Sequence, residues 1–155
     1  MMIKKEGWVK RVWNPAIFIV VLGAACSFSG AVGPNRVCFD GHCIFVEIAQ
    51  ADEELQRGLQ DRKSLGEENG MLFIFPQPGI YGFWMKDTLI PLDIIWLNEE
   101  RKVIYVAESV PPCPNEPCAT YGPAQESRYV LEINSGGAKH RGIRTGDQAV
   151  FEFSR

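Results

Sequence analysis

The stretch Gly70–Leu97, which reads GMLFIFPQPGIYGFWMKDTLIPLDIIWL, decides how this chain folds. It contains two of the four tryptophans and two apolar runs typical of strands, separated by prolines and glycines. Its few charged residues, Lys86, Asp87 and Asp93, have apolar neighbours, and an ionised side chain is costly in such surroundings unless it is paired. The stretch therefore predicts the centre of a compact β domain.

The first 25 residues have the layout of a secretory signal. A basic segment containing Lys4 and Lys10 precedes the apolar run 16–22, and small residues follow before Cys26. The apolar run is shorter than the roughly 20 residues that span a bilayer. We expect residues 1–25 to be a signal peptide, with an uncleaved N-terminal anchor as the alternative.

Cys26 follows small residues, as in a bacterial lipoprotein cleavage box, where the cysteine is lipidated and becomes the new N-terminus. Leu22 lies four residues before the cysteine, one more than is usual. The alternative is ordinary signal-peptidase cleavage near Ala25 or Ala31. We favour lipidation, which gives membrane attachment, and interpret residues 26–35, rich in Ser, Gly and Pro, as a flexible tether.

The other four cysteines form two pairs with the same spacing, Cys38 with Cys43 and Cys113 with Cys118. In an exported protein such pairs usually become disulfides. Four cysteines allow three connectivities, and turn signals inside each loop favour the local pairs Cys38–Cys43 and Cys113–Cys118. A zinc site using His42 beside Cys43 is the alternative, but it lacks the two-residue spacing of most zinc knuckles. We expect no metal and no cofactor.

The charge balance argues against a nucleic-acid partner. Removal of residues 1–25 changes the counts from 16 basic and 19 acidic residues to 12 and 18, a net charge of −6. Binding to phosphates needs a basic surface, and no dense basic run follows the signal. An envelope protein or a small molecule is the expected partner.

Residues 36–155 are expected to form one mainly β domain, an antiparallel β-sandwich or partly open barrel with one or two short helices. The runs 36–40 and 43–49 around Asp40-Gly41 predict a hairpin. Asp52 is expected to cap a helix over 53–60. Further strands are predicted at 72–75, 81–85, 92–97, 102–109, 128–133 and 147–153. The proline-rich segment 111–123 is expected to be a loop outside the core.

Six motifs occur in order along the domain: Arg57-Gly58-Leu59, Gly70-Met-Leu-Phe, Phe83-Trp-Met-Lys-Asp-Thr88, Ile90-Pro-Leu-Asp93, Arg128-Tyr-Val-Leu-Glu132 and Gly142-Ile-Arg-Thr-Gly-Asp147. Together they resemble the domain of unknown function 192 family, small and often exported bacterial and archaeal proteins. The resemblance covers about residues 46–153. It implies a β-sandwich-like fold with a small helical element and, since the family's activity is uncharacterised, no catalytic residue. Asp87 departs from the asparagine that members usually have.

Asp93 and Glu132 are the acids expected to be buried. Asp93 is either a structural carboxylate, paired with Arg57 or Arg128 or capping backbone donors, or a catalytic or ligand-binding acid. Glu132 alternates with Val130 and Arg128 on one strand face and has the same two interpretations. The structural alternative predicts a buried polar network of Arg57, Asp93, Arg128 and Glu132.

Trp84, Lys86, Asp87 and Thr88, with Asp93, form a candidate ligand pocket. A tryptophan, a cation and small polar groups at a loop suit a small ligand or a sugar ring; the alternative is a core aromatic followed by a solvated turn. Gly136-Gly137 is a weaker anion-site candidate. We predict an envelope binding or accessory domain without enzymatic activity. The alternative is a hydrolase-like enzyme that uses Asp93 or Glu132 with Lys86 or an arginine.

Overall fold

The computed structural model describes residues 34–154. The predicted signal peptide, Cys26 and most of the predicted tether lie outside the described residues. Nine strands and two short helices follow along the chain: β1 (Arg36–Phe39), β2 (His42–Ala49), α1 (Asp52–Arg57), β3 (Asn69–Gly79), β4 (Phe83–Trp84), β5 (Leu92–Leu97), β6 (Val103–Val110), β7 (Thr120–Tyr121), β8 (Ser127–Asn134), α2 (Gly137–His140) and β9 (Ala149–Glu152).

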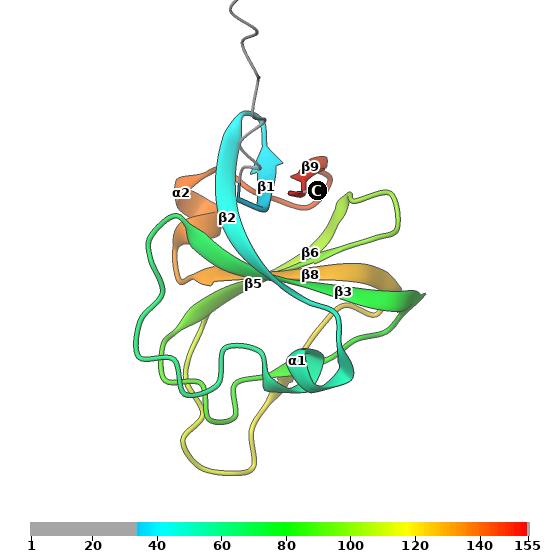
Figure 1. Cartoon of the computed structure of the whole chain (residues 1–155). Coiled ribbons are helices and arrows are strands. Elements are labelled where there is room, and N and C mark those ends of the chain that lie inside the picture. The colour runs from blue at the N-terminus through cyan, green and yellow to red at the C-terminus, as the bar shows by residue number, and fades with distance from the viewer. Residues whose placement is uncertain (1–33, 155) are drawn as a thin grey trace, which may run out of the picture. The chain divides into compact units, whose positions relative to one another are not determined.

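Seven of these strands form one curled sheet in the order β6-β5-β8-β3-β2-β1-β9, and β4 pairs with β7 in a small second sheet (Figure 1). The prediction of a mainly β, partly open barrel is confirmed. One pairing differs from the antiparallel expectation, because β2 and β3 run parallel. Parallel neighbours need a crossover connection, and here α1 and the loop after it make that crossover.

The two edge strands of the curled sheet approach each other at one end. Lys102, next to β6, forms an isolated bridge with Gln148, next to β9. Beside it, the N–H of Val103 donates to the carbonyl of Asp147 at 2.9 Å, and the N–H of Gly146 donates to the carbonyl of Val103 at 2.8 Å. These contacts satisfy backbone groups that an open sheet would leave unpaired.

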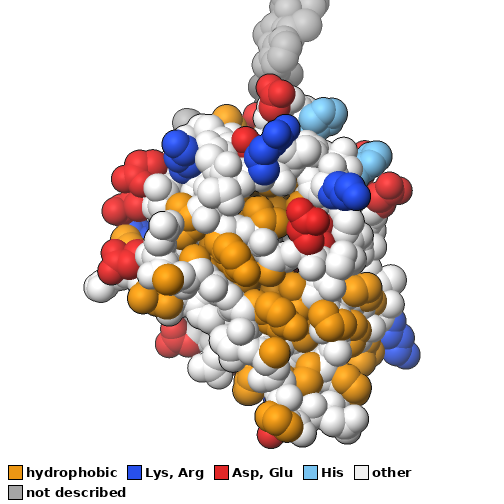
Figure 2. Space-filling view, turned by 180° about the vertical axis from the view of Figure 1, so that it is seen from behind, with side chains coloured by type: hydrophobic (Ala, Val, Ile, Leu, Met, Phe, Trp, Pro, Cys, Tyr) orange, Lys and Arg blue, Asp and Glu red, His pale blue; other side chains and the backbone are white. Residues whose placement is uncertain are grey.

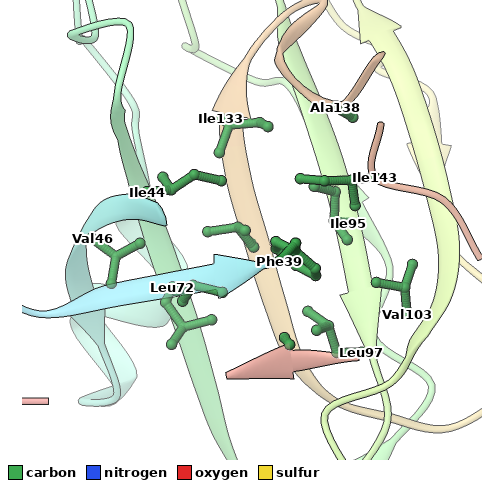
Figure 3. Close-up of a cluster of buried hydrophobic side chains, with 13 residues drawn as sticks. Phe39, Ile44, Val46, Leu72, Ile95, Leu97, Val103, Ile133, Ala138 and Ile143 are labelled. Carbon is green, nitrogen blue, oxygen red and sulfur yellow. The ribbon is translucent and has the colours of Figure 1, made fainter. Parts of the chain in front are cut away.

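Both faces of the central strands are buried, so the sheet separates two hydrophobic clusters. Figure 3 shows the inner core, where side chains such as Phe39, Leu72, Ile95 and Ile133 converge from several strands. The outer core, on the other face, contains Phe73, Ile94, Trp96 and Val130. Strand β5 contributes to both clusters, which explains why all six of its residues are buried.

The first helix begins and ends earlier than the sequence predicts. Ala51, not Asp52, is the N-cap, and the Glu54 carboxylate accepts the backbone N–H groups of Gln50 and Ala51, both at 3.0 Å. These hydrogen bonds lower the pKa of Glu54. The helix ends at Arg57 because Gly58 adopts φ +50°, a left-handed conformation that suits glycine.

The proline-rich segment 111–123 contains a strand that the sequence did not predict. Thr120 pairs with Trp84 and Tyr121 with Phe83, which forms the β4–β7 sheet. The segment therefore covers part of the outer core instead of forming a loop alone. Among the described residues, no helix has the length and apolar character needed to cross a membrane.

Both cysteine pairs lie at disulfide-bonding distance, in the local pairing that the loop signals favour. Cys38 and Cys43 face each other across the β1–β2 hairpin, and Cys113 joins Cys118 in the segment before β7. Sulfurs bonded to each other are not available as thiolate ligands, so this pairing counts against the zinc alternative.

We expect peptide mapping under non-reducing conditions to recover Cys38 with Cys43 and Cys113 with Cys118. A loop this short restrains the unfolded chain by about 2 kcal/mol. Replacing Cys38 and Cys43 together by serine should therefore lower the free energy of unfolding by about that amount and leave the fold intact. A peptide that joins Cys38 to Cys113 would contradict the pairing.

Candidate functional site

A cleft of about 780 Å³ lies over the outer face of the sheet. Its walls come from α1 and the turn after it, from residues 80–84, and from residues 86–88, while β3 and β8 form its floor. Seen from the back of the molecule, hydrophobic side chains spread across the middle and lower part of the surface, and most charged side chains lie above them (Figure 2). The volume is within the range of small-molecule sites, about 300–1,000 Å³.

Glu132 is the buried polar residue on the floor of this cleft. It is 5% exposed, and its Oε2 atom has no hydrogen-bond partner among the described residues. Burial raises the pKa of Glu132 to about 8, so the carboxyl group keeps its proton at neutral pH. Gly58 leaves space above it, because an added Cβ there would lie 3.8 Å from Oε2 and 3.1 Å from the Phe73 ring.

Aromatic rings line the cleft beside Glu132. Phe73 and Phe83 meet edge to face with centroids 4.9 Å apart, and Phe75 stacks on Tyr81 at 3.6 Å. The buried Trp96 donates its indole N–H to the Tyr81 carbonyl at 2.8 Å, which fixes the start of this wall. Trp84 differs from the others, since 49% of it is exposed at the rim.

Two cationic side chains lie on the rim, and they differ in whether they form an ion pair among the described residues. Lys86 Nζ forms an ion pair with Glu116 and lies 5.5 Å from the centroid of the Trp84 ring. The hydrogen bond to Glu116 raises the pKa of Lys86, and the same bond lowers the pKa of Glu116. Arg57 is exposed and forms no ion pair or side-chain hydrogen bond within residues 34–154.

Asp87 and Thr88 complete the rim beyond Lys86. Asp87 has φ +57°, and its carbonyl accepts the N–H of Asp61 at 2.8 Å, which connects this turn to the end of the α1 segment. Asparagine and aspartate tolerate the left-handed conformation better than other side chains. The backbone thus explains why an aspartate can replace the asparagine that the resemblance implies. Thr88 is 6% exposed.

The disulfide-containing segment supports the wall that carries Trp84 and Lys86. The N–H of Cys113 donates to the carbonyl of Met85 at 3.2 Å, and Lys86 forms an isolated bridge with Cys113. On the other side of the Cys113–Cys118 loop, Thr120 pairs with Trp84. The loop therefore contacts the wall on both sides, and Glu116 within it holds Lys86.

Reduction of this loop should loosen the wall. We expect replacement of Cys113 and Cys118 by serine to increase amide hydrogen exchange across residues 83–88 by about tenfold or more, since local opening follows local stability. The matched control replaces Cys38 and Cys43, which lie away from the cleft. Equal exchange in the two double variants would contradict a specific role of the Cys113–Cys118 loop.

Asp93 does not belong to the cleft, contrary to the predicted pocket. It is fully buried on the opposite face, where Oδ1 accepts the N–H of Ser109 at 2.7 Å and Oδ2 accepts the N–H of Ala138 at 2.9 Å. Its partners are backbone N–H groups and not an arginine. This arrangement agrees with the alternative in which Asp93 is a structural acid that caps backbone donors. The Asp93 carboxylate thus occupies the start of α2, where Gly136-Gly137 was a candidate anion site. The N–H of Ala138 there donates to a carboxylate of the protein itself.

The predicted network of four charged residues is therefore wrong. Asp93 pairs in register with Ile133 and Ile94 pairs with Glu132, so the two acids project from opposite faces of the sheet. Arg57 lies on the cleft rim. Arg128 forms a 3.3 Å ion pair with Glu99 in the β5–β6 turn. Strand register, which the sequence does not display, separates these side chains.

Of the predicted pocket residues, the structure brings together Trp84, Lys86, Asp87 and Thr88 and adds Arg57 and Glu132 from the predicted network. Sequence reasoning did not assign the aromatic wall of Phe73, Phe75, Tyr81 and Phe83 to the site. The density of aromatic residues between Phe73 and Trp84 was the available signal, but the same density is typical of a core.

The model of the family DUF192, described as an uncharacterized ACR, matches residues 35–151. A solved protein of unknown function from Novosphingobium aromaticivorans is 36% identical, with 76% of this chain and 83% of that chain covered and a TM-score of 0.68. A candidate transcription regulator from Sinorhizobium meliloti is 28% identical, with 76% and 91% covered and a TM-score of 0.69. No curated protein matches. With a family match over most of its length, this chain belongs to the DUF192 family.

Proposed function

We propose that this protein is an extracytoplasmic binding domain that holds a small molecule in the cleft above Glu132. The observation that carries the proposal is the buried Oε2 atom of Glu132, which has no partner among the described residues and belongs to a residue that lines a cavity large enough for a ligand. A ligand that hydrogen-bonds to this carboxyl group would supply the missing partner.

The contrast between the two buried acids supports a binding role for Glu132. Asp93 has a backbone donor for each carboxyl oxygen, as expected of a structural acid. An unsatisfied buried polar atom costs about 1–3 kcal/mol. Glu132 carries such a cost without a structural contact that explains it, and perturbed acids of this kind concentrate at functional sites.

Two disulfides in the structure suggest an oxidising, extracytoplasmic location. The order of basic, apolar and small residues before Cys26 supports export, and Cys26 supports attachment to a membrane through lipid. Export and attachment through lipid are both part of the proposal. The excess of acidic residues argues against a role on DNA for this chain, although one similar structure is described as a candidate transcription regulator.

Lipidation predicts a specific mature N-terminus. We expect the protein purified from membranes to begin at Cys26 and to carry the additional mass of acyl chains. Intact mass spectrometry measures both properties. A mature chain that begins after Ala31, with no acyl mass, would exclude the lipid anchor and leave ordinary secretion.

The protonated state of Glu132 also favours a second candidate function, acid catalysis. A carboxyl group that keeps its proton at neutral pH can protonate a leaving group, and Arg57 on the rim could stabilise developing negative charge. Asp93, the other acid considered for this role, lies on the wrong face of the sheet. The hydrolase-like alternative therefore depends on Glu132 as its acid.

Ligand-observed NMR with a library of neutral, cationic and anionic fragments at pH 7 tests the binding function. We expect some fragments to bind wild type and to lose binding in Glu132→Leu. The matched control is Glu126→Gln, an exposed carboxyl group outside the cleft lining, which should bind as wild type does. Fragments that bind both variants equally, or no binding at all, would overturn the proposed site.

A further inference from the structure

We propose that the ligand is an uncharged sugar, alone or within a glycan, that stacks on Trp84 and hydrogen-bonds to Glu132. This inference rests on the proposed function, because it assigns a ligand class to the same cleft. Three properties of the cleft support it: its balance of charge, its hydrogen-bonding groups and the exposed indole ring at its rim.

The charges that line the cleft balance each other. Arg57 and Lys86 are cationic, whereas Glu53 and Asp87 are anionic. Glu116, which pairs with Lys86, lies outside the lining and adds at most one negative charge near the rim. A strongly charged ligand would therefore meet like charge beside opposite charge, and neither sign is favoured. The lining suits a ligand without net charge.

The polar groups of the cleft suit hydroxyl groups, which donate and accept at the same time. The Glu132 carboxyl group, when protonated, has the same dual capacity. Arg57 offers a fork of donors, and Asp87 offers acceptors from another part of the lining. An apolar ligand would leave Glu132 Oε2 without a partner, and polar buried groups are usually satisfied. The set thus favours a ligand with several hydroxyl or ether oxygens.

Trp84 provides a surface for the apolar face of a sugar ring. Nearly half of it is exposed although the other large aromatic side chains of the cleft are mostly buried. The pairing of β4 with β7 and the contact with Lys86 fix its position. An indole ring held in this way offers a large contact area with little loss of conformational entropy on binding.

The test uses maltotriose, cellotriose and the trimer of N-acetylglucosamine as neutral probes, with spermidine and trigalacturonate as charged probes. Isothermal titration calorimetry and protein-observed NMR are applied to the purified mature protein. We expect at least one neutral trisaccharide to bind, with chemical-shift changes at Trp84 and Glu132. Trp84→Ala and Glu132→Leu should each weaken that binding at least tenfold.

Phe153→Ala is the matched control for Trp84, because Phe153 is an exposed aromatic residue, 44% accessible, that does not line the cleft. It should leave trisaccharide affinity unchanged. Charged probes that bind while all neutral probes fail would overturn the sugar inference and leave the proposed binding function intact. Sugar binding that Trp84→Ala does not weaken would also overturn it. If neither these probes nor the fragment library binds, both proposals fail.

Discussion

Replacing Glu132 by glutamine should stabilise the protein at pH 9 and have little effect at pH 4.5. The Glu132 carboxyl has a pKa of about 8 in the folded protein, against 4.5 for the ordinary value that applies to the unfolded chain. Between these values the folded protein holds a proton that the unfolded chain has released, so the stability of wild type falls as pH rises through this window. Above pH 8 the Glu132 carboxyl is ionised in both the folded and the unfolded protein, and the whole cost of burying its charge is present.

Glutamine does not ionise, so the variant escapes that loss. Each pH unit in the window corresponds to about 1.4 kcal/mol, and the full separation gives an upper value of about 5 kcal/mol at pH 9. Urea unfolding of wild type and Glu132→Gln at several pH values measures the difference, with Glu126→Gln as the exposed control. A stability difference that stays constant from pH 4.5 to 9 would show that Glu132 is not a protonated buried acid.

Replacing Asp93 by asparagine should destabilise the protein by about 3 kcal/mol. The carboxyl group accepts one backbone N–H on each oxygen, from Ser109 and Ala138. Asparagine has one oxygen and one NH₂ group, so one acceptor position becomes a donor that faces a donor. Lost hydrogen bonds to a charged group are worth about 1.5–3 kcal/mol, and an unsatisfied buried donor adds a cost of similar size.

Lys86→Ala is the control for this experiment. Its ion pair with Glu116 is at the surface, where such pairs contribute about 0–1 kcal/mol. Unfolding in urea should therefore show a clear loss for Asp93→Asn and a small one for Lys86→Ala. A midpoint for Asp93→Asn at or above that of wild type would contradict the structural role. Fragment binding in the cleft should be unchanged in Asp93→Asn, since Asp93 lies on the other face.

The β architecture could be predicted from the sequence, because the alternation of apolar and polar residues and the turn residues are local signals. The strand Leu92–Leu97 and the hairpin around Asp40-Gly41 coincide closely with β5 and with β1–β2. The parallel pairing of β2 with β3 was missed, since it depends on how the intervening helix returns the chain. The short β7 strand was missed because prolines and glycines around it indicate a loop.

The candidate site was harder to predict, and the two buried acids show why. Asp93 and Glu132 both interrupt apolar runs, so composition treats them alike. Their roles depend on the register between β5 and β8, which places them on opposite faces. The partners of Asp93 are backbone N–H groups that have no side-chain signature. Glu132, in turn, is recognised by the absence of such partners, which only the folded arrangement reveals.

The pairing of β1 with β9 places the entry and exit of the domain side by side. The Asn35 side chain accepts the N–H of Ser154 at 2.9 Å, and both ends lie at the opposite end of the domain from α1 (Figure 1). In a chain held at a surface through its N-terminus, α1, whose residues line the cleft, would consequently lie at the end of the domain farther from the point of attachment. The same geometry makes either terminus suitable for immobilising the protein on a sensor chip without blocking the site.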